Sequence, residues 1–94
     1  MLLARVVGNV IATRKDPRLE GKKLLVLQIA TPQGELKPGS YVIAVDTVGA
    51  GVRETVIAVS GSSARMAAGM KETPVDTAII GIVDQVDLDR AGGG

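Results

Sequence analysis

Two segments of this chain carry apolar side chains at nearly every position, and this pattern is the strongest constraint on how it can fold. They are residues 24–27 and 78–83, which lie inside the strands expected at 23–29 and 77–86. Successive side chains of a β-strand point to opposite faces, so each segment is a strand that is apolar on both faces. In the second segment Ala78, Ile80 and Ile82 share one face. One face can fill a core, and the other must be covered by the rest of the chain or by a second subunit.

The chain has 94 residues, which is the length of a single domain. Short runs of β-branched residues, separated by clusters of proline, glycine and polar residues, predict an all-β fold with a small helical content, either a small barrel or a sandwich. A loop is expected between the clusters at 31–34 and 37–40. We expect one short helix at 63–68, begun by Ser62 as N-cap. The five expected strands are residues 3–13, 23–29, 41–46, 54–59 and 77–86.

The composition excludes several classes of catalytic site. The chain has no His, Cys, Trp or Phe, and Tyr41 is its one aromatic residue. Without Cys and His there is no disulfide, no thiolate nucleophile, no Cys-based metal site and no Ser-His-Asp triad. We therefore expect a protein that is not an enzyme and holds no cofactor or metal. A chain without cysteine is compatible with the cytoplasm, and no apolar run reaches membrane-spanning length.

The glycine-rich segment Gly49-Ala50-Gly51 has three readings. A dinucleotide-binding loop would need a third glycine where Glu54 stands, followed by a helix, whereas a strand is expected here. Two readings remain open. The segment is either a tight turn or a loop whose backbone crowds round a symmetry axis, where a larger side chain would not fit.

The segment Gly61-Ser62-Ser63-Ala64-Arg65 is similar to a nucleophile elbow except at its last position, where glycine is required. A serine–lysine pair with Lys71 is the remaining catalytic arrangement, and a helix cap is the favoured reading. Asp84, Asp87 and Asp89 could hold a hard cation loosely, but no calcium-loop spacing is present, and a solvated chain end is favoured.

Nucleic-acid binding is the alternative function, because some small β-barrels bind single-stranded nucleic acids. Residues 14–23 contain five basic and two acidic residues, which give this stretch a net charge of +3. Barrels that bind single strands stack bases on aromatic side chains, and this chain offers Tyr41 alone. The net charge of the whole chain is +1, which also argues against a nucleic-acid partner.

Five segments together resemble the EutN/CcmL family, the pentameric vertex proteins of bacterial microcompartment shells such as the carboxysome. The resemblance covers residues 1–88. It is carried by Ala4-Arg5-Val6-Val7-Gly8, by Gly21-Lys22-Lys23-Leu24-Leu25-Val26, by Ala44 to Gly51, by Gly61 to Arg65, and by Pro74-Val75-Asp76 leading into Ile80-Gly81-Ile82-Val83-Asp84.

The resemblance implies a five-stranded barrel of the oligonucleotide-binding type with one short helix, formed by residues 1–88, with 89–94 as a flexible tail. It implies a non-catalytic homopentamer in the cytoplasm that caps the vertices of a shell built from hexameric proteins and introduces curvature. It also implies that Gly49, Ala50 and Gly51 surround a central pore. A hexameric ring remains an alternative to the pentamer. Subunit contacts are implied at Gly61, Ser62, Ser63 and Arg65.

Overall fold

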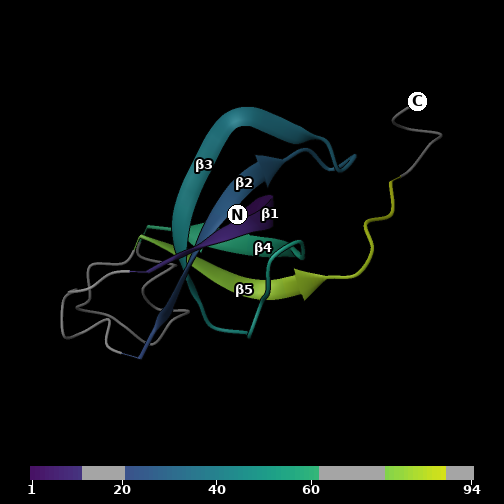
Figure 1. The fold of residues 1–94 in the computed structure, drawn as a ribbon. Coiled ribbons are helices and arrows are strands. Elements are labelled where there is room, and N and C mark those ends of the chain that lie inside the picture. The colour runs from purple at the N-terminus through teal and green to yellow at the C-terminus, as the bar shows by residue number, and fades with distance from the viewer. Residues whose placement is uncertain (12–20, 62–75, 89–94) are drawn as a thin grey trace.

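The five expected strands are present and close into a barrel (Figure 1). The computed structural model describes residues 1–11, 21–61 and 76–88. The all-β prediction is confirmed, whereas the helix expected at 63–68 and the tail at 89–94 lie outside the described residues. The strands are β1 (Leu2–Val10), β2 (Lys23–Ala30), β3 (Leu36–Asp46), β4 (Thr55–Ser60) and β5 (Thr77–Val83).

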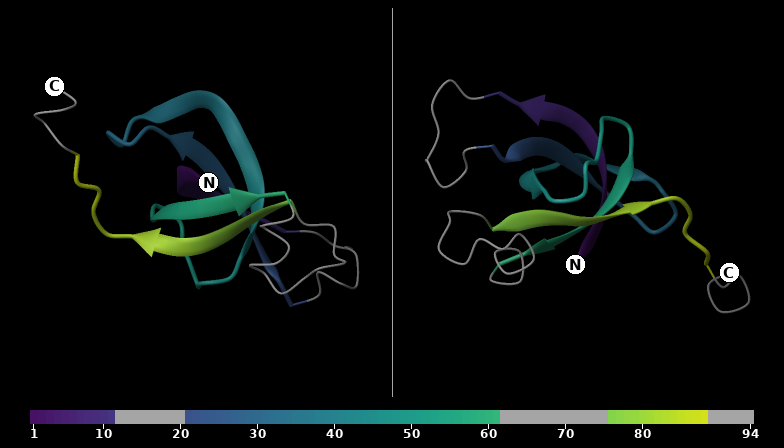
Figure 2. Two further views of the ribbon diagram at one scale, coloured as in Figure 1. Left: turned by 180° about the vertical axis from the view of Figure 1, so that it is seen from behind. Right: turned by 90° about the horizontal axis from the view of Figure 1, so that it is seen from below.

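The barrel closes in the order β1-β2-β3-β5-β4, with β4 returning to β1. Among the described residues, β3 and β5 run parallel, with Val45 opposite Ala78, and the other neighbouring strands are antiparallel. β1 pairs with both β2 and β4, and its register against β2 shifts between Val6 and Gly8. Such a shift bends a strand and increases its twist, which helps so few strands to close (Figure 2).

The inward side chains form one apolar core. On β2, Leu25 and Leu27 are fully buried, while Leu24 and Val26 on the outer face are partly exposed. The expected strand with two apolar faces is therefore confirmed, and the barrel itself fills one of those faces. Besides the two leucines, the core cluster contains Ala4, Val6, Ala44, Ala50, Val56, Ala58 and Ile79.

The face assignment expected for β5 needs a correction. A register shift places Ile79 opposite Ala58 and Ile82 opposite Val56, so Ile80 is an extra residue in the pairing with β4. Strict alternation put Ile80 and Ile82 on one face, and an inserted residue breaks that period. Ile80 and Ile82 nevertheless remain partly uncovered.

The predicted start of β3 is wrong by five residues. The cluster at 37–40 was expected to be loop, but β3 begins at Leu36, which pairs with Ala30. The next pair is Tyr41 with Gln28, so residues 37–40 form an excursion inside the strand. Proline is tolerated there because a bulged position needs no ladder donor, and Gly39 adopts the left-handed φ of 75°.

The other boundaries differ from the prediction by smaller amounts. β1 ends at Val10, β4 is displaced by one residue, and β5 ends at Val83 instead of residue 86. Residues 84–88 leave the barrel as an exposed segment (Figure 1). Within the described ranges, no helix is long and apolar enough to cross a membrane.

Candidate functional site

The connection from β3 to β4, residues 47–54, carries the glycine segment that the sequence singled out. Asp46, the last residue of β3, fixes its start. One carboxylate oxygen of Asp46, Oδ1, accepts hydrogen bonds from the backbone N–H of Val48 at 3.0 Å and of Gly49 at 3.1 Å. Gly49 has a φ of 80°, a conformation that glycine adopts without steric cost. The loop therefore leaves the strand through an Asx-type turn.

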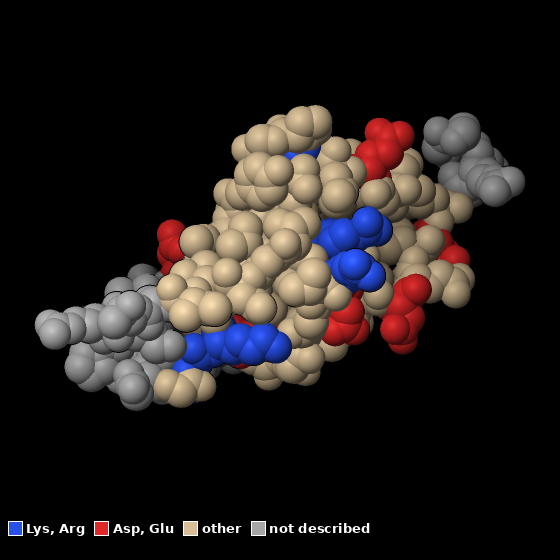
Figure 3. Space-filling model, in the orientation of Figure 1, with Lys and Arg blue, Asp and Glu red and all other residues tan. Residues whose placement is uncertain are grey.

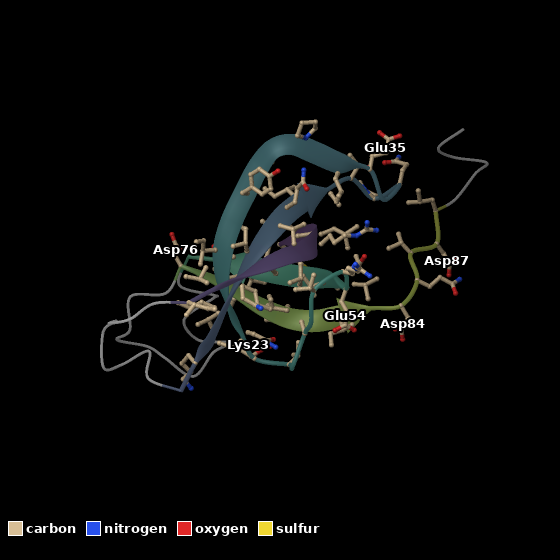
Figure 4. The ribbon with its side chains drawn as sticks, viewed as in Figure 1. Lys23, Glu35, Glu54, Asp76, Asp84 and Asp87 are labelled. Atoms are coloured by element: carbon tan, nitrogen blue, oxygen red, sulfur yellow. The ribbon has the colours of Figure 1, made fainter. Side chains whose placement is uncertain are left out.

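The middle of the loop is tied to β2. The Lys23 ammonium donates a hydrogen bond to the carbonyl oxygen of Ala50 at 2.7 Å, and it lies 3.7 Å from Oδ2 of Asp46 (Figure 4). Half of the Lys23 side chain is exposed, so the ion pair adds little stability, and the hydrogen bond is the more important contact. Lys23 thus links the two ends of the turn.

The end of the loop is held by Glu54 and by β1. Oε1 of Glu54 accepts a hydrogen bond from the Gly51 N–H at 2.7 Å, and the Glu54 N–H donates to the Gly51 carbonyl at 3.1 Å. The Arg53 N–H donates to the carbonyl of Val6 at 2.8 Å, and the Val6 N–H donates to the carbonyl of Glu54 at 2.9 Å. Arg53 adopts a φ of 80°, which is costly for a residue with a side chain.

These contacts give the glycine segment two different sides. Ala50 is fully buried and belongs to the barrel core, whereas Gly49 and the neighbouring Val48 and Val52 are exposed. The sequence grouped Gly49, Ala50 and Gly51 as one surface. The structure places the methyl group of Ala50 inside the barrel and leaves the backbone of Gly49 on the outside.

Sequence reasoning missed three side chains that shape this loop. An aspartate at a strand end before a glycine-containing turn is a local signal for Asp46, because Asp commonly bonds to N–H groups two or three residues ahead. Glu54 lies three residues after Gly51 and is local in the same sense. Lys23 bonds to a carbonyl 27 residues away, and no local pattern predicts such a contact.

Of the four residues expected to make subunit contacts, the structure describes only Gly61. Gly61 is exposed, has a φ of 71° and donates its N–H to the carbonyl of Asp76 at 2.8 Å. Ser62, Ser63 and Arg65 lie outside the described residues, as does Lys71. Their contacts therefore stay predictions.

The acidic residues of the chain end are dispersed. Asp84 and Asp87 are exposed on the segment that leaves the barrel, and Oδ1 of Asp87 accepts a hydrogen bond from Nε2 of Gln85 at 2.7 Å (Figure 4). In the described part of the chain, no three His, Cys, Asp or Glu side chains gather into a possible metal site. Asp89 lies beyond that part.

Comparison with known proteins gives one family. The sequence profile of the family described as "Ethanolamine utilisation protein EutN/carboxysome" matches residues 1–84. The carboxysome shell vertex protein CcmL of Gloeobacter violaceus is 43% identical, over 96% of this chain and 89% of that protein. The bacterial microcompartment shell vertex protein GrpN of Rhodospirillum rubrum is 45% identical, over 93% of this chain and 97% of that protein.

Solved structures agree with the sequence matches. The structure of Gloeobacter violaceus CcmL superposes with a TM-score of 0.87 at 43% identity and covers 95% of this chain and 91% of that chain. The structure of GrpN from Rhodospirillum rubrum, described as a pentameric microcompartment shell protein, superposes with a TM-score of 0.85 at 43% identity. It covers 95% of this chain and 100% of that chain.

Proposed function

The chain belongs to the EutN/CcmL family, and from that premise we propose that it is a shell vertex protein of a bacterial microcompartment. In this role it forms a homopentamer that caps the corners of the polyhedral shell. The observation that carries the proposal is the match over nearly the whole chain, at 43–45% identity, with proteins named as shell vertex proteins. In the proposed role the protein has a structural task that involves no catalytic step and no cofactor.

The mechanism is geometric. A flat sheet of six-fold tiles curves when a five-fold ring replaces one of them, because a wedge of material is removed at that point. Hexameric shell proteins are the partners that such a corner requires. A cyclic ring uses two different surfaces of each copy, in head-to-tail contacts that close after a fixed rotation. Exposed apolar side chains, Tyr41 and Ile43 on β3 and Ile80 and Ile82 on β5, supply surface for such contacts.

Within this assembly we assign the glycine segment to the surroundings of the five-fold axis. Gly49, Ala50 and Gly51 allow the backbones of neighbouring copies to approach closely. Because the Ala50 side chain is buried inside the barrel, the surface nearest the axis would consist of Gly49 and the exposed flanking residues Val48 and Val52. Gly61, Ser62, Ser63 and Arg65 remain the proposed subunit contacts.

The native mass of the purified protein is the first test. Mass spectrometry under non-denaturing conditions is expected to give five copies, and six copies would require a hexameric ring instead. A monomer that binds single-stranded oligonucleotides, with an affinity that falls as salt rises, would support the nucleic-acid alternative and contradict the vertex role.

Deletion of the gene tests the role in the cell. Shells that lack their corner protein are expected to remain open or to elongate, because the five-fold ring that introduces curvature is then missing. Closed polyhedra of normal shape in the deletion strain would contradict the proposal.

A further inference from the structure

The outside of β2 and β3 carries an exposed apolar surface, which we call the β2–β3 face and define as Val26, Tyr41 and Ile43. Val26 lies directly opposite Ile43 in the ladder, and Tyr41 is two residues away on the same side of β3. Tyr41 is 57% exposed and Ile43 is 52% exposed. The area over these strands bears few charged side chains in Figure 3. Large apolar side chains uncovered side by side are typical of a contact surface.

A second apolar surface lies over β1 and β4, and it contains a hollow. We call it the β1–β4 face and define it as Met1, Leu3 and Ile57. Together with Leu2 these residues line a shallow hollow of about 250 Å³. Leu3 lies opposite Ile57 in the ladder. On the far side of Ile57 its partner is Gly81, where an added Cβ would meet no atom within 4 Å.

The two faces are separate sites on one barrel. Between them runs a polar row on the outer surface, in which Arg5 of β1 lies opposite Gln28 of β2 and Thr55 of β4. Arg5 is exposed, and Nε2 of Gln28 donates a hydrogen bond to the carbonyl of Lys37 at 3.1 Å. No single apolar partner surface can cover both faces without also covering this row.

We propose that the β2–β3 face of one copy packs against the β1–β4 face of the next copy, with Tyr41 and Ile43 seated in the hollow beside Ile57. This inference rests on the proposed ring. A head-to-tail ring needs two different surfaces that fit each other on every copy, and here one face exposes two large side chains while the other has a hollow of about 250 Å³ that could receive them. A few well-packed side chains near the centre of a contact, tyrosine often among them, carry most of its binding free energy.

Charge substitution at the centre of each face tests the pairing. Ile43→Glu alone places a carboxylate against an apolar hollow, and Ile57→Lys alone places an ammonium against apolar side chains. Each is expected to weaken association by about thirtyfold or more, which is the scale of interface hot spots. Native mass spectrometry and sedimentation over a range of protein concentrations measure the loss of the ring. The double variant I43E/I57K is expected to restore it, because every contact then joins opposite charges.

Leu88→Glu is the matched control. Leu88 is 50% exposed, close to the value for Ile43, and it lies on the segment beyond β5 and belongs to neither face. This variant is expected to keep the native ring. Circular dichroism monitors folding of each variant. If either charged variant fails to fold, the milder pair Ile43→Thr and Ile57→Thr is compared with Leu88→Thr, with the same order of effects expected.

The outcomes separate this inference from the proposed function. If the unmodified chain forms the ring and folded Ile43→Glu or Ile57→Lys forms it equally well, the assigned faces are wrong and the vertex role stands. A double variant that stays dissociated would also overturn the direct pairing of these two faces. If the unmodified chain forms no ring, the proposed function itself fails.

Discussion

The two connections that flank β3 are held in different ways. In the β2–β3 hairpin, the Thr31 N–H donates to the carbonyl of Glu35, the Gly34 N–H donates to the carbonyl of Thr31, and the Glu35 N–H donates to the hydroxyl of Thr31. All these partners lie within five residues. The β3–β4 connection instead bonds to Lys23 of β2 and to Val6 of β1, far away in the sequence.

The difference concerns what determines each conformation. A hairpin closed by its own residues can form wherever its strands meet, because its turn chemistry is local. The β3–β4 connection has local bonds of its own, but its contacts with Lys23 and Val6 form only when β2 and β1 lie beside it, and its Ala50 is part of the core. Substitutions that disturb the contacts of this connection with the core should therefore lower the free energy of unfolding more than substitutions at exposed positions of the hairpin do.

The largest effect is expected from Ala50→Asp. The Ala50 side chain is fully buried among apolar residues, so the new carboxylate would have no partner. The free energy of unfolding should fall by at least about 3 kcal/mol. Urea denaturation at one fixed protein concentration measures it, since assembly also contributes to the apparent stability.

The matched hairpin variant is Gln33→Asp, at an exposed position. It should change the free energy of unfolding by no more than about 0.5 kcal/mol. Equal losses for the two variants would show that the buried position of Ala50 makes no difference. The contrast between the two connections would then be wrong.

The sequence alone predicted the parts of the fold that rest on local patterns. The apolar run from Leu24 to Leu27 was enough to predict a strand with a buried and an uncovered face, and the polar cluster at 31–34 marked the hairpin. Pro38 and Gly39 caused the start of β3 to be predicted too late in the sequence, because turn residues also occur inside a bulged strand. The extra residue in β5 depends on pairing with β4, which no local pattern contains.

Of the candidate site, the sequence predicted the position of the glycine segment but not the orientation of its side chains. Its position followed from Gly49 and Gly51 and from the family resemblance. The burial of Ala50 did not, because it depends on the Lys23 hydrogen bond and on the carbonyl of Val6, contacts that exist only in the closed barrel. The distinction between a glycine that faces outward and an alanine that faces inward is a tertiary property.

A smaller effect is expected from Asp46→Ala. This change removes two hydrogen bonds to the backbone of Val48 and Gly49 together with the ion pair to Lys23. Hydrogen bonds to a charged group are the stronger kind, so the free energy of unfolding should fall by about 2 kcal/mol. Urea denaturation measures this loss.

Thr31→Ala is the hairpin counterpart, since it removes one hydroxyl that accepts from the Glu35 N–H on an exposed turn. It should cost about 0.5 kcal/mol. If Thr31→Ala proved as costly as Asp46→Ala, a nearly buried carboxylate that accepts two hydrogen bonds would stabilise its turn no more than one exposed hydroxyl does.

The smallest effect, and one of opposite sign, is expected from Arg53→Gly. Arg53 holds a φ of 80°, and glycine would remove a steric cost of about 1 kcal/mol while adding somewhat less in backbone entropy. The free energy of unfolding should rise by about 0.5 kcal/mol.

In the hairpin, Gly34 already holds a φ of 91°. Gly34→Ala should therefore lower the free energy of unfolding by about 1 kcal/mol, although an added Cβ there meets no atom within 4 Å. Urea denaturation of both variants beside the unmodified chain compares a residue with a side chain and a glycine in the same left-handed conformation. A marked loss for Arg53→Gly would mean that the arginine side chain makes a stabilising contact, in the ring or within the chain, that outweighs its backbone strain.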